Sequence, residues 1–362
     1  MKYGGHAAFK ITLPKALDIK WFMKRILFDY WIKLYLYNNR LILNIKRKQW
    51  KYVDNIILLI LFPYMLLRYM LSVIYERIYG FKLVFKQNKQ DISTEFKYKL
   101  GIVCIAKNEG PYIKEWIEYH RCIGFDIFYF YDYDSNDDTL AVLKDYIEQG
   151  LVIYTPINGK GMQLYAYNDA IDKYKKDCKY MAFLDLDEYL FPMQPNCEID
   201  KLLDTWCERF PGASGCGINW CLFGSSGHKK RPSGLIIENY IYRGVNNHWA
   251  NYHVKTICNP RRVKYFISPH YPLYNLGAFS VTDAENGKRQ YGWFNRDVLY
   301  KTLRINHYYT KSEEDYVRKV SRGLGDRDGG YDINQFNKYN LNNIKDDSMC
   351  RYWDALKRKL ES

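Results

Sequence analysis

The chain has 362 residues, of which 48% are hydrophobic and 17% aromatic, so it can bury a sizeable core and is not globally disordered. Its formal net charge of +14 is uneven: residues 1–99 hold 19 Lys and Arg against 6 Asp and Glu, whereas residues 100–362 hold 35 against 34. The nine cysteines include no CxxC pair, which favours reduced thiols over a disulfide framework or a structural zinc site.

The basic excess lies in a first segment that is rich in aliphatic and aromatic residues. Residues 17–45 combine a basic stripe with an aromatic face, which is typical of a helix in a membrane interface. Residues 55–75 are long enough to cross a bilayer, but Arg68 interrupts them, so a span, monotopic attachment and a packing helix stay open. No cleavable signal peptide is visible. We therefore expect residues 1–99 to be a helical membrane-associating region and linker that contacts a membrane surface through residues 17–80, and not nucleic acid.

From residue 99 onward, short apolar runs of strand length alternate with helical patterns. Pro111 suits the first turn of a helix and Gly124 suits its end, while Ser135 with Asp138 resembles a capping box before the second helix. Alternation of this kind predicts an α/β fold with a mainly parallel sheet. The expected strands cover 99–106, 126–131, 151–155 and 180–184, and the expected helices cover 111–124, 139–150 and 161–178.

Polar clusters follow three of these strands, at residues 107–110, 132–137 and 185–188. In open α/β sheets, ligands bind beyond the carboxyl ends of the strands. Asp185 and Asp187 lie two residues apart on an apparently extended segment, so we expect both carboxylates to face one partner. A divalent cation held by carboxylates and substrate phosphates would relieve their repulsion. A solvated strand end or a helix-capping Asp is the structural alternative.

Two segments, "CIAKNEGPYIKEWIEYHRCIGFDIFYFYDYDSNDDTLAVLKDYI" and "MAFLDLDEYLFP", resemble glycosyltransferases of the GT-A fold. In particular they are similar to the family 2-like and family 92 group of the galactosyltransferase type. Shorter segments at 223–228, 255–263, 268–272 and 305–323 fit the same group. The resemblance covers residues 100–325 and implies a GT-A domain, Rossmann-like with a mainly parallel sheet, over residues 100–330. For residues 331–362 we predict a C-terminal tail or a surface helix.

The resemblance also assigns roles to residues of this chain. Asp187 would bind Mn²⁺ or Mg²⁺, and Asp185 would face the ribose or a metal-bound water. The remaining assignments are Ala106, Asn108 and Glu109 at the nucleotide, Asp132 and then Asp134 at the uracil or ribose, His270 or His307 at the metal, and Lys311 at the diphosphate.

The chemistry needs a carboxylate that takes the proton of an acceptor hydroxyl, and direct displacement then inverts the anomeric centre. Glu238 in "GLIIENY" is the first candidate, with Asp283 and Glu285 as alternatives and an exposed helix charge as the structural reading of Glu238. Trp220 or Phe223, and Trp249 with His248, are candidates for stacking on sugar.

The predicted function is therefore inverting, metal-dependent transfer of a sugar, galactose first, from a UDP-sugar to a glycan or lipid-linked oligosaccharide acceptor. The basic N-terminal segment and the unpaired cysteines favour the cytoplasmic face of a bacterial inner membrane. A nucleotidyltransferase of similar fold, which would use a triphosphate donor, is the alternative enzyme. A non-catalytic glycan-binding membrane scaffold is the alternative of another class.

Overall fold

The computed structural model describes residues 95–361, apart from residues 160, 276, 283–286, 291, 299 and 323–332. The helix predicted at 17–45 and the hydrophobic stretch at 55–75 lie outside the described residues. Within the part of the chain that is described, we find no helix both long and apolar enough to cross a membrane. The nine cysteines all fall in this part; each is a free thiol, and five are buried.

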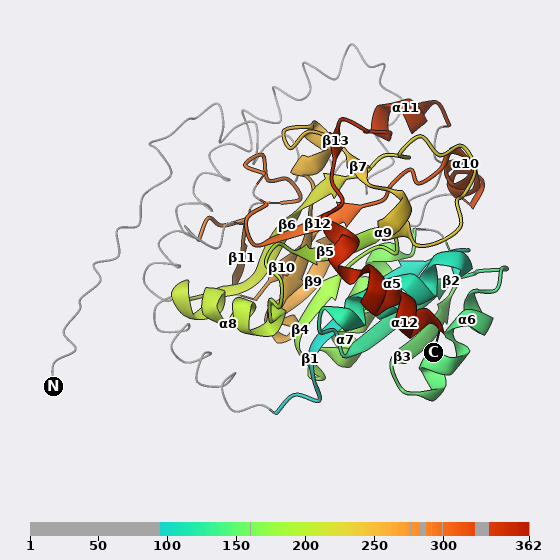
Figure 1. Cartoon of the computed structure of the whole chain (residues 1–362). Coiled ribbons are helices and arrows are strands. Elements are labelled where there is room, and N and C mark those ends of the chain that lie inside the picture. Colours follow the sequence, from blue (N-terminus) through green and yellow to red (C-terminus); the bar gives the residue numbers. More distant parts are fainter. Residues whose placement is uncertain are drawn as a thin grey trace, which may run out of the picture. The chain divides into compact units, whose positions relative to one another are not determined.

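The first half of the described chain has the predicted alternation of strands and helices (Figure 1). Strands β1 to β4 lie side by side in the order β3-β2-β1-β4, and every neighbouring pair in this run is parallel. The elements are β1 (Tyr98–Ala106), α5 (Gly110–Cys122), β2 (Ile127–Tyr133), α6 (Thr139–Glu148), β3 (Val152–Ile157), α7 (Gln163–Tyr174) and β4 (Cys178–Phe183). The prediction of an α/β fold is confirmed, with boundaries that shift by up to four residues.

Successive side chains of β1 lie on opposite faces of this sheet, as the two-residue period of a strand requires. Ile102 and Cys104 belong to the cluster that contains Trp116 of α5. Val103 and Ile105 belong to the other cluster, which contains side chains of α7. The strands are therefore covered on both faces, which is why they read as continuous apolar runs.

The helix ends are only partly those expected from the sequence. Pro111 lies in the first turn of α5, and Gly124, just after the helix, has the positive φ of 100° that glycine adopts without strain. The capping box before α6 is wrong: Asp138 is the N-cap residue and its side chain makes no capping hydrogen bond. The Ser135 hydroxyl instead accepts the backbone N–H of Asn108 at 2.9 Å, which joins the loops that follow β1 and β2.

The second half of the chain makes the sheet mixed. Among the described residues, the central sheet continues from β4 in the order β8-β6-β12-β5, with β11 beside β6. Strand β8 is antiparallel to β4 and β6, β12 and β11 are each parallel to β6, and β5 is antiparallel to β12. Parallel pairs therefore outnumber antiparallel ones in the described central sheet, as expected, and the antiparallel strands β8 and β5 make it mixed.

The elements of this half range from two to eleven residues. They are β5 (Glu188–Pro192), α8 (Ile199–Arg209), β6 (Ala213–Leu222), α9 (Ile236–Asn239), β7 (Tyr242–Arg243), η3 (Trp249–Tyr252), β8 (Val254–Cys258), η4 (Pro260–Arg262), β9 (Val263–Ser268), β10 (Tyr271–Tyr274), β11 (Phe279–Val281), β12 (Leu303–His307), α10 (Glu313–Arg322), η5 (Ile333–Gln335), α11 (Phe336–Tyr339), β13 (Ile344–Lys345), η6 (Ser348–Tyr352) and α12 (Trp353–Glu361).

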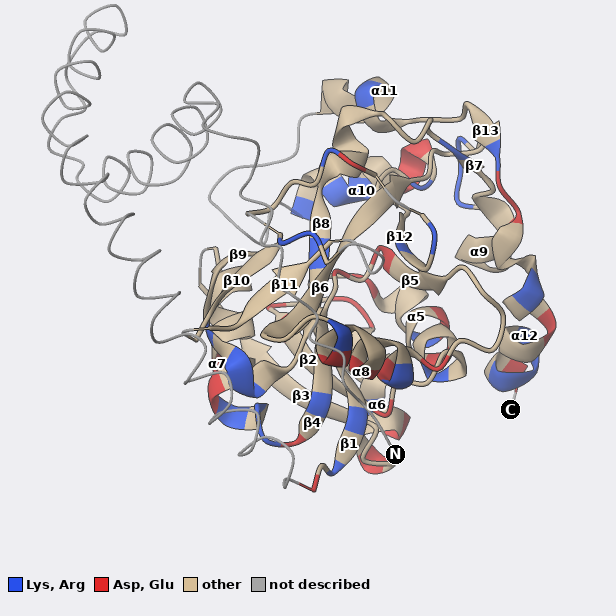
Figure 2. Cartoon of the chain, turned by 90° about the vertical axis from the view of Figure 1, so that its left-hand side faces the viewer, with Lys and Arg blue, Asp and Glu red and all other residues tan. Residues whose placement is uncertain are grey.

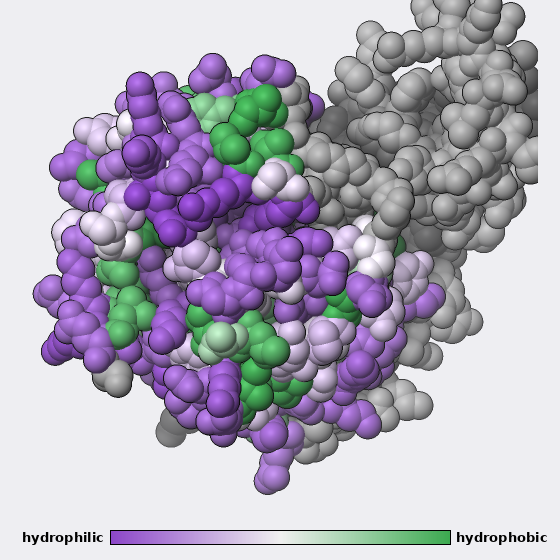
Figure 3. Space-filling view, turned by 90° about the vertical axis from the view of Figure 1, so that its right-hand side faces the viewer, coloured by the Kyte–Doolittle hydropathy of each residue, from purple (hydrophilic) through white to green (hydrophobic). Residues whose placement is uncertain are grey.

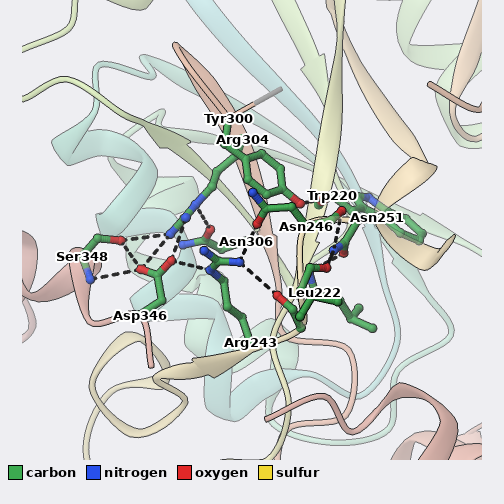
Figure 4. Close-up of polar contacts among 12 residues, drawn as sticks. Trp220, Leu222, Arg243, Asn246, Asn251, Tyr300, Arg304, Asn306, Asp346 and Ser348 are labelled. Carbon is green, nitrogen blue, oxygen red and sulfur yellow. Dashed lines mark hydrogen bonds and ion pairs between the residues drawn. The ribbon is translucent and has the colours of Figure 1, made fainter. Parts of the chain in front are cut away.

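The C-terminal segment packs on this domain. Strand β13 pairs with β7, and Leu356 of α12 is fully buried. Asp346 accepts hydrogen bonds from Arg243 at 2.6 Å and from Arg304 at 2.8 and 3.1 Å (Figure 4). Ser348 donates to the same carboxylate. This buried charge cluster fixes the segment against β7 and β12.

The surface of the described domain carries both charges. Figure 2 shows basic and acidic residues side by side on α7, α8 and α12. The face seen in Figure 3 is mostly hydrophilic, and its hydrophobic residues form separate patches. This mixed surface agrees with the near balance of charge in residues 100–362.

Candidate active site

A four-residue turn, 184–187, joins β4 to the antiparallel strand β5 and holds the paired acids. The turn is closed by its own backbone and by Glu188: the N–H of Asp185 donates to Glu188 Oε2 at 2.9 Å, and the N–H of Glu188 donates to the carbonyl of Asp185 at 3.0 Å. The segment is therefore bent and not extended. The extended conformation that was expected is therefore wrong, and each aspartate contacts its own cation, Lys255 for Asp185 and Lys319 for Asp187. A metal ion shared by the two carboxylates stays a prediction.

Asp187 is buried between two later elements. Its Oδ2 accepts a hydrogen bond from Lys319 Nζ of α10 at 2.7 Å, and its Oδ1 lies 3.4 Å from Nε2 of His307, the last residue of β12. Burial alone would raise the pKa of Asp187, but Lys319, His307 and Lys311 together hold it well below its usual range. Asp187 is therefore a carboxylate at neutral pH.

Asp185 is only partly buried and contacts three side chains. Its Oδ2 lies 2.9 Å from Nζ of Lys255, on β8. Its Oδ1 accepts hydrogen bonds from Gln163 at 2.7 Å and Tyr167 at 3.2 Å, both on α7. These contacts fix the direction of the carboxylate, and the side chain stays 32% exposed.

Beneath the turn lies a second, fully buried pair. Lys255 Nζ is 3.4 Å from Glu188 Oε2, and neither side chain has any exposed area. Burial raises the pKa of Glu188. The carboxylates of Asp185 and Glu188 raise the pKa of Lys255 and keep it protonated. Lys255 and Lys319 were not assigned from the sequence. Both lie in segments that resemble the family, but nothing in their local pattern marks a lysine as a partner of a distant acid.

Of the two histidines predicted at the metal, the structure brings His307 to Asp187. His270 contacts Trp220 instead, with ring centroids 5.3 Å apart, and the Trp220 ring centroid is also 4.3 Å from that of His307. Nδ1 of His270 is 2.9 Å from the carbonyl of Val254. Burial lowers the pKa of His307, and Asp187 opposes this only in part, so we infer a neutral imidazole that is competent as a ligand.

The residues after β1 form a charged group beside this turn. Asn108 has a left-handed backbone, with φ of 53°, and its side chain accepts the N–H of Asn136 at 2.8 Å. Glu109 is 3% exposed and forms ion pairs with Lys311, at 3.5 Å, and with Arg322. Lys311 is itself buried, and its ion pair with Glu109 places it beside the loop that follows the carboxyl end of β1.

The acids after β2 differ from each other. Asp132 is opposite Ala106 in the register of β1 and β2 and accepts a hydrogen bond from Tyr154 at 2.6 Å. It is 5% exposed. Asp134 has a side chain that is 72% exposed and lies 3.7 Å from Lys107. The structure therefore brings Ala106, Asn108 and Asp132 together, with Asp134 further out on the same loop.

The first candidate general base, Glu238, is paired with a lysine of the C-terminal helix. Glu238 lies on the four-residue helix α9 and forms an ion pair of 2.8 Å with Lys357 of α12. Asp283 and Glu285 lie outside the described residues. The identity of the base therefore stays a prediction.

The Asp187 carboxylate and the His307 imidazole fit a divalent ion that receives its other ligands from substrate phosphates and water. One carboxylate oxygen and one imidazole nitrogen are 3.4 Å apart. Over the described ranges, no group of three or more His, Cys, Asp or Glu side chains gathers as a ligand set. Mg²⁺ and ions like it are commonly held by one or two carboxylates together with substrate phosphates and water, which is the arrangement that this pair allows.

Comparison with known proteins places these residues in a family. The sequence profile of glycosyltransferase family 92 matches residues 101–347. A glycosyltransferase family 92 protein of Ricinus communis, RCOM_0530710, is 23% identical over 229 residues, which cover 63% of this chain and 38% of that protein. The Arabidopsis thaliana family 92 protein At1g27200 is 25% identical over 253 residues, covering 68% and 40%. The chain thus spans about two fifths of the length of these curated relatives. They are plant proteins and give no support to the expectation of a bacterial membrane.

Among solved structures, the chain is distantly similar to Staphylococcus aureus TarS 1-349, which is 14% identical with a TM-score of 0.34 and covers 62% of this chain and 63% of that one. Another is the glucosyl-3-phosphoglycerate synthase of Mycobacterium tuberculosis in complex with Mn²⁺, UDP-glucose and phosphoglyceric acid. It is 18% identical with a TM-score of 0.23 and covers 34% and 44%. These likenesses are distant, so the family assignment rests on the sequence profile. That profile spans more than half of the chain and includes the 184–187 turn, His307 and Lys311, and the chain therefore belongs to glycosyltransferase family 92.

Proposed function

We propose that this chain transfers a sugar from a UDP-sugar donor, UDP-galactose first, to a hydroxyl of a glycan or lipid-linked oligosaccharide. The observation that carries the proposal is the buried Asp187–His307 pair beside Lys311 and Lys319, at the carboxyl edge of the sheet. Attachment to a membrane surface through residues 17–80 stays a prediction, as does the cytoplasmic face of a bacterial membrane.

The donor would lie across the loops that follow β1 and β2. The loops are joined by the Asn108–Ser135 hydrogen bond, which holds the two nucleotide-binding segments in one arrangement. The hydrogen bond from Tyr154 fixes the orientation of the Asp132 carboxylate, which would accept a hydrogen bond from a ribose hydroxyl or a uracil N–H. Pre-ordered polar groups lose little entropy when the ligand binds.

The leaving diphosphate must be neutralised while the sugar–phosphate bond breaks. Lys311, Lys319 and Arg322 supply positive charge at this edge, and their present partners are Glu109 and Asp187. Asp187 and His307 would hold a divalent cation, Mn²⁺ or Mg²⁺, which supplies Lewis-acid stabilisation of the diphosphate when it is bound.

The proposed reaction is a direct displacement. The acceptor oxygen forms a bond to the anomeric carbon, the bond from that carbon to the diphosphate oxygen breaks, and the electron pair leaves with UDP. The proton of the acceptor hydroxyl passes to a carboxylate, for which Glu238 and Asp283 remain the candidates. One displacement inverts the anomeric configuration.

Calorimetry with UDP tests the donor site directly. Wild-type protein should bind UDP with Mn²⁺ and lose at least about tenfold in affinity in EDTA, and Asp187→Ala should bind weakly in both. Asp204→Ala, which removes a partly buried carboxylate that pairs with Lys179 and accepts from Tyr180, is the control for general effects of losing an acid. Folded wild-type protein that binds no UDP would refute the UDP donor. Binding of a nucleoside triphosphate instead would favour the nucleotidyltransferase alternative.

A further inference from the structure

A closed circuit of aromatic and imidazole rings begins at the proposed metal ligand His307. The six rings come from β6, η3, α11, β12 and the residues that flank these elements. Going around the circuit, the centroid distances are 4.3 Å for His307–Trp220, 4.7 Å for Trp220–His253, 6.2 Å for His253–Trp249, 5.7 Å for Trp249–Tyr339, 4.6 Å for Tyr339–Tyr309 and 5.4 Å for Tyr309–His307. We call these six side chains the aromatic circuit.

The aromatic circuit differs from the core aromatics in its exposure. Trp116 and Tyr119, for comparison, are fully buried. In the aromatic circuit only His307 is buried, and Trp249 is 39% exposed. Phe294 extends the circuit, since its ring is 4.4 Å from that of His253 and it is 37% exposed. The other four rings of the aromatic circuit are only partly buried, so rings gathered from distant segments leave some apolar surface open to a ligand.

The same group presents polar atoms beside the rings. His253 Nδ1 is 3.0 Å from the carbonyl of Ala250 and must be the protonated nitrogen there, which leaves Nε2 as an acceptor. His270 is arranged in the same way with Val254. Burial lowers the pKa of His253 to about 4, so this imidazole is neutral at pH 7. Lys338 Nζ lies 4.8 Å from the Trp249 ring centre and provides a donor at the rim.

A pyranose is complementary to this combination of apolar ring surfaces and polar atoms. One face of its ring carries C–H groups that pack on an aromatic side chain, and its edge carries hydroxyls that need acceptors and donors. Half-exposed aromatic rings with a few fixed polar groups are the usual lining of a small-molecule site. An acyl chain would instead favour a continuous aliphatic lining without imidazoles and a lysine, and would leave their hydrogen-bonding atoms unused.

We propose that the aromatic circuit, with Phe294, is the acceptor subsite and binds a neutral hexopyranose oligosaccharide next to Asp187. This rests on the proposed function, because it takes Asp187 and His307 as the donor diphosphate end. The strand order supports it: the donor loops follow β1 and β2, whereas Trp220 and His307 lie on β6 and β12, beyond β4 and β8. Donor and acceptor would thus meet from opposite sides of the 184–187 turn.

Binding of the full chain to an array of neutral hexose and N-acetylhexosamine oligosaccharides, two to six sugars long, tests this with UDP and Mn²⁺ present. Trp249→Ala and Phe294→Ala should each weaken binding roughly tenfold, because stacking on an aromatic ring contributes about that factor. Trp249→Phe should recover most of the binding, since it restores a ring. Tyr265→Ala is the matched control: Tyr265 is 42% exposed and lies on β9, outside the aromatic circuit.

The outcomes separate the two proposals. UDP calorimetry on the same samples reports the donor site alone, so its failure in wild-type protein would refute the proposed function. UDP binding without any array glycan bound would overturn the acceptor subsite. Unchanged glycan binding in both alanine variants, or a loss of UDP binding equal to the loss of glycan binding, would also overturn it. Binding to dodecyl-chain detergent micelles but to no oligosaccharide would indicate a lipid site.

Discussion

Replacing Lys255 by methionine should remove the cation that two acids of the site share. Its ammonium is 2.9 Å from Asp185 and 3.4 Å from Glu188, and its side chain has no exposed area. Methionine keeps the length and the apolar stem, so the change is chiefly one of charge. Removing one partner of a buried ion pair costs about 3–5 kcal/mol, because the other charge stays buried without compensation.

The cost should depend on pH in a definite direction. Burial already raises the pKa of Glu188, and Lys255 opposes this, so the variant raises it further. A carboxyl group whose pKa is higher in the folded state than its unfolded value of about 4.3 makes stability fall as pH rises between the two pKa values. The difference in unfolding free energy between wild type and Lys255→Met should therefore be smaller at pH 5 than at pH 8.

Urea unfolding followed by tryptophan fluorescence at both pH values measures this difference. The control is Lys144→Met, which removes a lysine whose side chain is 72% exposed and 3.9 Å from Glu148; it should cost less than about 0.5 kcal/mol. The double variant Lys255→Met with Glu188→Gln should recover part of the loss, because it removes the uncompensated carboxylate as well. A Lys255→Met protein as stable as the Lys144→Met control at pH 8 would refute the reasoning.

Two further changes test other buried charges. Asp346→Asn should cost roughly 3 kcal/mol, because it leaves Arg243 and Arg304 without their carboxylate. Burial alone would raise the pKa of Asp346, but the two arginines hold it well below its usual range, so its contribution is present above about pH 4 and is lost as pH falls from there. Acid unfolding of the variant should accordingly be shallower, and an unchanged acid profile would contradict this role. Glu115 accepts the backbone N–H groups of Ile236 and Ile237, and burial raises its pKa to about 7. Stability should therefore fall as pH rises from about 4.5 to 7, and Glu115→Gln should flatten that part of a thermal melting profile; a profile as steep as that of wild type would argue against it.

The sequence contains enough local information to predict the first four strands and the position of the paired acids. Each strand is a short apolar run, and each following helix has its own apolar face, so nothing distant is needed to identify them. Asp185 and Asp187 stand out because they interrupt an apolar segment. The bend at 184–187 was missed, because it depends on Glu188 accepting the N–H of Asp185 and not on any turn residue.

Local sequence patterns do not identify the ion-pair partners of Asp185 and Asp187. Lys255 is 70 residues beyond Asp185 in the sequence, and Lys319 is 132 beyond Asp187. The choice of His307 over His270 likewise depends on the strand pairing that sets His307 opposite Glu188. Such contacts follow from the order of strands in a mixed sheet, which local periodicity does not determine.

The pairing of charges also explains how the sheet tolerates several acids at one edge. The cations come from outside the first four strands: Lys255 from β8, Lys311 from the loop before α10, and Lys319 and Arg322 from α10. Without them, Glu109, Asp187 and Glu188 would be buried and uncompensated, at several kcal/mol each. The β1–β4 half therefore depends on the later half for its stability as well as for the site. The same ion pairs therefore hold the acids of the site in place and stabilise the contact between the two halves of the sheet.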